Sequence, residues 1–189
     1  RFERGDCVAI DGERLGSLAA MQHANDLAGQ YGIGLRNALE NRIIGTKSRG
    51  VYESPGLELL GFGLRAVYQA TMDRRSTGLF HSMSRLVAEQ IYDGRLFDPG
   101  ARAALAGIEV LARHATGTVR VGMYRGNMYF EGLTGCAASL YNPADASMEA
   151  SDGLNPVSSQ GYVEVQAVEA WAIAKAGQTK DNPDDFDKF

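Results

Sequence analysis

Residues 40–55, which read ENRIIGTKSRGVYESP, constrain the fold of this 189-residue chain more than any other segment. Carboxylates, cations, an amide and a phenol lie among few aliphatic residues. A segment that is only core would show an apolar period, whereas one that is only loop would not contain Ile43, Ile44 and Val51. We predict two short buried strands that present fixed polar side chains at a surface. Either this surface meets a charged small molecule or another domain, or the segment is a salt-bridged hairpin without a ligand.

Composition restricts the class of protein. The chain is 44% hydrophobic and 22% charged, which is ample material for a folded core, and its net charge of −4 argues against nucleic-acid binding. The sequence contains no apolar run long enough to cross a membrane and no opening signal-peptide pattern. We expect a cytoplasmic protein in which the two cysteines, Cys7 and Cys136, are free thiols. The three histidines are scattered, so no metal site is predicted.

The order of predicted elements indicates an α+β domain, because strands and runs of helices are mixed without regular βαβ alternation. Residues 1–15 read as strand, turn and strand around Asp11-Gly12, and residues 118–132 as a hairpin turning at Gly126-Asn127. Helices are expected over residues 18–27 with Ser17 as N-cap, 55–72, 79–92, 99–116 and 161–176. Residues 71–78 are expected to form a polar connection and 142–159 a loop. The last helix is apolar on more than one face, which favours docking against a partner.

No phosphate-binding or nucleophile motif occurs in the sequence, whether G-x-x-x-x-G-K-S/T, G-x-G-x-x-G between strand and helix, or G-x-S-x-G. The only candidate site is therefore the segment that ends at Tyr52. In an extended segment Glu40 and Arg42 share a face. A carboxylate and a phenol on neighbouring strands of this segment could hold the ammonium group and a polar end of one amino-acid-like ligand. This is a binding arrangement, so no catalytic residue is predicted.

The segment from Glu40 to Pro55 closely resembles the E-N-R-x-x-G-x-K-S-R-G-x-Y-E-x-P signature of argininosuccinate synthase. The likeness continues upstream through FERG at residues 2–5 and YGIG at 31–34. It continues downstream through TMDR at 71–74, YDGRLF at 92–97 and SLYN at 139–142. It covers almost the whole chain except the acidic end.

The resemblance implies a ligase that joins citrulline to aspartate: ATP (with Mg²⁺) adenylates the citrulline ureido oxygen, and the aspartate amine then displaces AMP. By matched motif positions, Glu40 and Tyr52 look like citrulline contacts, while Arg42, Lys47 and Arg49 are better placed as scaffold or domain-interface groups. The family also implies a homotetramer interlocked by a terminal helix. Residues 1–160 would then be the synthetase domain, 161–177 the oligomerisation helix and 178–189 a disordered acidic tail.

One departure from the family is large. Its S-G-G-x-D-T-S pyrophosphate loop, on an N-terminal nucleotide-binding domain, has no counterpart here. We therefore expect this chain alone neither to bind ATP in the family manner nor to catalyse the ligation. Two alternatives stay open at this point: a non-catalytic oligomerisation or regulatory module of the same fold, and a divergent ligase for another ureido or carboxylate substrate. Two features are the basis for the second alternative: Thr46, where the family often has a larger apolar residue, and the less ordinary helix near Gly61.

Overall fold

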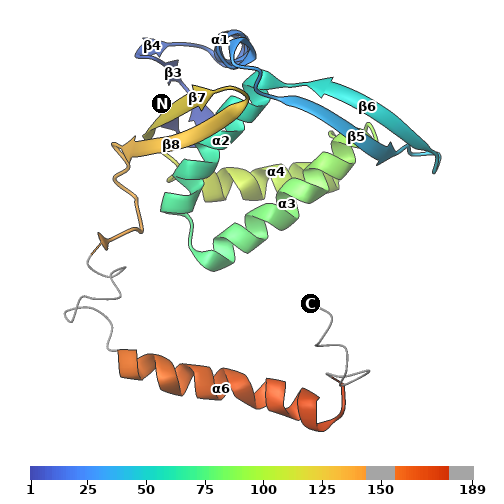
Figure 1. Ribbon diagram of the computed structural model, residues 1–189, viewed down its shortest axis with the longest axis vertical. Coiled ribbons are helices and arrows are strands. Elements are labelled where there is room, and N and C mark those ends of the chain that lie inside the picture. Colours follow the sequence, from blue (N-terminus) through green and yellow to red (C-terminus); the bar gives the residue numbers. More distant parts are fainter. Residues whose placement is uncertain (144–155, 179–189) are drawn as a thin grey trace. The chain divides into compact units, whose positions relative to one another are not determined.

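The structure is a computed structural model that describes residues 1–143 and 156–178. The chain divides into one compact unit over Arg1–Tyr141 and a second over Asn142–Phe189. Helices and short antiparallel strand pairs make the first unit, which confirms the predicted α+β class (Figure 1). The acidic tail and most of the predicted 142–159 loop lie outside the described residues.

The first residues form two short antiparallel pairs, β1 (Phe2–Glu3) with β2 (Asp6–Cys7) and β3 (Ala9–Ile10) with β4 (Glu13–Arg14). The predicted Asp11-Gly12 turn is confirmed, since both residues have positive φ angles of 50° and 86°. The backbone of Phe2 also exchanges two hydrogen bonds with that of Gly117, which ties the start of the chain to the later hairpin.

Helix α1 (Ser17–Gln30) begins and ends close to the predicted positions, but its N-cap differs from the predicted one. Gly16, rather than Ser17, is the N-cap, and no side chain caps the helix. The buried stripe consists of Ala20, Ala24 and Ala28, whereas Leu18 is exposed. Small side chains at four-residue spacing let α1 pack closely on the next helix.

Helix α2 (Pro55–Thr71) starts at the proline expected in its first turn. Helix α3 (Arg74–Tyr92) starts earlier than predicted, so the prediction of a polar connection over residues 71–78 is wrong. Helix α3 starts early because Asp73 caps it: the Asp73 carboxylate accepts hydrogen bonds from the amides of Arg75 at 2.9 Å and Ser76 at 3.1 Å. Helix α4 (Pro99–Ala112) packs along α3 (Figure 1).

The second long hairpin joins β7 (Thr118–Tyr124) to β8 (Asn127–Thr134) and is confirmed. Its turn is one residue earlier than predicted, because the positive φ angles belong to Arg125 and Gly126 while Asn127 already lies in β8. This hairpin, α2 and β1 enclose a small core. The core consists of Phe2, Val67 and Ala115, with Cys7, Leu64, Tyr68, Val119 and Leu133 packed against it.

The first long hairpin joins β5 (Leu35–Asn41) to β6 (Lys47–Glu53), so the predicted strand pair is present. Its position differs, because Ile43 and Ile44, expected inside a strand, lie in the turn between the two strands. The expectation of buried strands is wrong. The hairpin extends outward from the start of α2 (Figure 1), and Leu39 is 80% exposed. The pair has no third strand among the described residues, so the outer edges of both strands are unpaired.

In the second unit, the described residues form helix α6 (Pro156–Lys175). It begins earlier than the predicted residue 161 and therefore takes up the end of the predicted loop. Its apolar side chains lie on several faces and are exposed, among them Val163, Val165, Val168 and Trp171.

Candidate functional site

The β5–β6 register assigns the polar residues of the signature segment to two faces. Arg36 lies opposite Tyr52, Ala38 opposite Gly50 and Glu40 opposite Ser48. Because side chains alternate along a strand, these six residues share one face of the hairpin. The other face consists of the remaining strand residues, Leu35, Asn37, Leu39, Asn41, Lys47, Arg49, Val51 and Glu53.

The first face brings together the two residues predicted as ligand contacts. The Tyr52 hydroxyl donates a hydrogen bond of 2.6 Å to Glu40 Oε1, and Arg42 Nη1 lies 3.1 Å from the same oxygen. Within the described residues, no hydrogen bond to Glu40 Oε2 is found. The Glu40 side chain is 29% exposed and Tyr52 is 43% exposed. An accessible carboxylate whose partners occupy one oxygen retains a second oxygen that can accept from a cation.

The hydrogen bond to Glu40 raises the pKa of the Tyr52 phenol above its usual value of 10.0. Desolvation raises this pKa further, while the nearby Arg42 charge lowers it. Tyr52 is therefore a neutral phenol at physiological pH. Its proton is committed to Glu40, which leaves the lone pairs of the hydroxyl oxygen to accept a hydrogen bond from a ligand.

Three contacts hold the β5–β6 hairpin in place within the first unit. At its base, the Ser54 amide donates to the Gly34 carbonyl at 3.0 Å, and Arg36 forms an ion pair with Glu58 of α2. Near its tip, the Tyr92 hydroxyl at the end of α3 donates to the Asn41 carbonyl at 3.4 Å. The pair of Glu40 and Tyr52 is thereby held between two helices.

The cations of the segment lie in different surroundings in the structure. Arg42 pairs with Glu40, so it belongs to the same cluster. Arg49 lies on the opposite face, where its Nε donates to Asn37 Oδ1 at 3.0 Å. Ser48, which sequence reasoning did not single out, lies beside Glu40 with a buried hydroxyl that has no hydrogen-bond partner among the described residues. Only the strand register could have revealed it.

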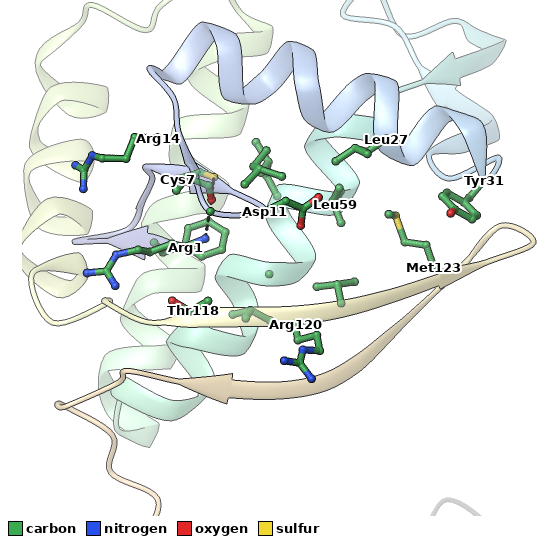
Figure 2. Close-up of a pocket in the computed structure, with 18 residues that line it drawn as sticks. Arg1, Cys7, Asp11, Arg14, Leu27, Tyr31, Leu59, Thr118, Arg120 and Met123 are labelled. Carbon is green, nitrogen blue, oxygen red and sulfur yellow. Dashed lines mark hydrogen bonds between the residues drawn. The ribbon is translucent and has the colours of Figure 1, made fainter.

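A cavity of about 620 Å³ lies elsewhere in the first unit, between the β3–β4 turn, α1, α2 and β7 (Figure 2). Its lining includes Arg1, Arg14, Arg120 and Asp11 around apolar side chains. The lining contains no residue of β5 or β6, both of which the structure describes in full. The cavity is therefore separate from the site formed by Glu40 and Tyr52.

Metal binding and membrane insertion are two further possibilities for residues 1–143 and 156–178. No cluster of three or more histidine, cysteine, aspartate or glutamate side chains there is suited to a metal ion. None of the helices in those ranges is long and apolar enough to span a membrane. Cys7 and Cys136 are free thiols, as predicted.

Fold and site define an α+β domain with a carboxylate–phenol pair on a projecting hairpin, and known proteins are similar to this chain in sequence. The family described as Arginosuccinate synthase C-terminal domain matches residues 1–173. The chain therefore belongs to the argininosuccinate synthase family, which confirms the resemblance found in residues 40–55.

Three curated relatives bear the name argininosuccinate synthase. The protein of Syntrophotalea carbinolica is 36% identical over 167 residues, which cover 88% of this chain and 41% of the relative. That of Leptospira biflexa is 35% identical, covering 94% of this chain and 44% of the relative. That of Roseiflexus sp. is 35% identical, covering 87% and 40%. The chain thus spans about two fifths of the length of these relatives.

Proposed function

We propose that this chain supplies the C-terminal half of an argininosuccinate synthase, the ligase that condenses citrulline with aspartate at the expense of ATP. The observation that carries the proposal is the contact between Glu40 and Tyr52. The two residues lie in the family signature, on one accessible hairpin face. Family membership supports the reaction, and the cluster supports the amino-acid substrate.

The ionised carboxylate of Glu40 is suited to the α-ammonium group of citrulline. Its Oε1 is occupied by Tyr52 and Arg42, so Oε2 would take the ammonium hydrogen bond. The Tyr52 hydroxyl oxygen would accept a second hydrogen bond from a ligand N–H group. Both side chains bind and orient, and neither takes part in bond making.

ATP and aspartate belong to a second half of the site. The sequence offers no glycine-rich phosphate cradle, and the described residues offer no acidic cluster for Mg²⁺. The residues of this chain therefore do not fit an ATP subsite. We propose that a nucleotide-binding domain or subunit supplies it and meets the hairpin face that carries Glu40.

Helix α6 supports assembly into a homotetramer. A helix that exposes valines and Trp171 on several faces gains stability when those faces are covered. The same observation favours the second candidate function, an oligomerisation or regulatory module that retains the fold without binding citrulline. The free thiols of Cys7 and Cys136 support a reducing compartment such as the cytoplasm.

A reconstituted reaction separates the two functions. The chain is combined with a nucleotide-binding half from the same family, and AMP release from ATP is measured with citrulline and aspartate. The proposal requires AMP release that depends on citrulline, together with argininosuccinate as product. If the two halves assemble but AMP release does not depend on citrulline, the result would favour the oligomerisation or regulatory module. AMP release that depends on another ureido or carboxylate compound would indicate a divergent ligase.

A further inference from the structure

The face that carries Glu40 and Tyr52 contains a glycine whose role the proposed function leaves unexplained. Gly50 lies in the middle of β6, between Ser48 and Tyr52 on the same face. Its φ angle is not in the left-handed region, so the backbone conformation does not require glycine. A glycine in a strand interior costs stability, and its usual justification is close approach of another group.

The group that approaches Gly50 is the phenol of Tyr52. A Cβ atom placed on Gly50 would lie 2.5 Å from Tyr52 Cε2 and 2.6 Å from both Cζ and Oη. These are the three atoms nearest to it, and all belong to the phenol. The ring therefore lies flat along β6, directly over the Gly50 backbone. Only in this position does the hydroxyl reach Glu40, which pairs with Ser48 rather than with Tyr52.

We propose that Gly50 is a positioning residue: its missing side chain lets the Tyr52 ring lie on the strand and brings the hydroxyl to Glu40. Ordinary carbon–carbon contacts are about 3.5–4.0 Å, so a methyl group at Gly50 would lift the ring by about 1 Å. The hydrogen bond of 2.6 Å to Glu40 would then lengthen beyond the range in which it is effective. Because the displaced atoms are the far end of an exposed side chain, the domain itself stays folded.

The first measurement does not involve a substrate. The pKa of Tyr52 is followed by carbon-13 NMR of the tyrosine ring in the 189-residue chain, with Tyr52→Phe to assign the signal. Glu40, Arg42 and Tyr92 are the charged or titratable groups that act on this phenol. Gly50→Ala is expected to lower the Tyr52 pKa toward its usual value. An unchanged pKa would overturn the inference.

Gly132→Ala is the matched control. Gly132 also lies inside a strand, β8, but a Cβ placed there meets nothing within 4 Å. This variant is expected to leave the Tyr52 pKa where it is in the wild type. A similar fall in both variants would show that any strand glycine has this effect, which would also overturn the inference.

A double variant keeps the inference testable if Gly50→Ala unfolds more easily than expected. Removing the ring with Tyr52→Ala also removes the overlap, so Gly50→Ala in that background should raise the urea midpoint slightly, because alanine is more stable than glycine inside a strand. The two substitutions are thus expected to be non-additive. An equal loss of stability from Gly50→Ala with and without the Tyr52 ring would refute the positioning role.

A second measurement rests on the proposed function. In the reconstituted ligase, Gly50→Ala is expected to raise the citrulline KM about tenfold with little change in kcat, because a hydrogen bond to a charged group is disturbed. Suppose instead that the Tyr52 pKa falls while the citrulline KM stays normal. The positioning role then stands, and the assignment of Tyr52 to citrulline fails.

Discussion

Replacing Gly34 by alanine tests how the hairpin is anchored at its base. Gly34 precedes β5 with φ +82°, a conformation that costs an L-residue about 1–2 kcal/mol. A Cβ there would also lie 2.6 Å from Ser54 C and Pro55 N, which are backbone atoms held by the start of α2. Overlap with backbone that cannot move freely adds about 1–3 kcal/mol. Gly34→Ala should therefore destabilise the first unit by about 2–5 kcal/mol.

Gly32→Ala provides the control. Gly32 also has a positive φ angle, +71°, but a Cβ there would meet nothing within 4 Å. Its substitution should cost only the conformational part, about 1–2 kcal/mol. The comparison uses urea unfolding followed by circular dichroism, because the single tryptophan, Trp171, lies in the other unit. If the two variants lose equal stability, the contact between Gly34 and the start of α2 does not restrain the hairpin.

Two further predictions concern the helices behind the site. Val67→Ala removes a fully buried side chain from the core and should cost about 2–3 kcal/mol, whereas the half-exposed Val110→Ala should cost less than about 0.5 kcal/mol; equal urea midpoints would contradict the assigned core. Asp73→Ala removes the N-cap of α3 and should lower the Tm by roughly 2–4 °C at pH 7. Hydrogen bonds from Ser76 and Arg75 lower the pKa of Asp73 from its usual 3.8, so this contribution is present above that pH. It is lost as the pH falls through the lowered pKa, and a difference that persists in acid would refute the assignment.

Patterns that depend on local chemistry predicted much of the fold. Pro55 correctly indicated the start of α2, and the alternating residues before and after Gly126 indicated the second hairpin. The start of α3 was missed because Arg74, Arg75 and Ser76 read as a polar loop. An aspartate N-cap outweighs that polarity, since it satisfies two backbone amides that the first turn would otherwise leave free.

Burial was predicted less well, because it depends on what covers a segment. Ile43, Ile44 and Val51 suggested buried strands, yet all three are exposed on the described chain. On α1, Ala20 and Ala24 were not predicted to be buried, since small residues carry a weak hydrophobic signal while allowing close helix contact. Both errors arise because burial depends on which segments, far apart in sequence, pack against each other.

The site shows the same division. The resemblance of residues 40–55 to the family signature selected Glu40 and Tyr52, and the structure brings their side chains within 2.6 Å of each other. The spacing of twelve residues does not reveal that Ala38, Ser48 and Gly50 share their face, because this follows from the register of the strands. The role proposed for Gly50 needed coordinates, since it depends on where the Tyr52 ring lies.

The central claim, that Glu40 holds citrulline, is tested most directly by the citrulline dependence of AMP formation in the reconstituted ligase. Glu40→Gln keeps the size of the side chain and removes its charge. Glu53→Gln makes the same change on the opposite face of the same hairpin. We expect Glu40→Gln to raise the citrulline KM about 10–100-fold and Glu53→Gln to leave it unchanged. A citrulline KM for Glu40→Gln equal to that of the wild type would contradict the account.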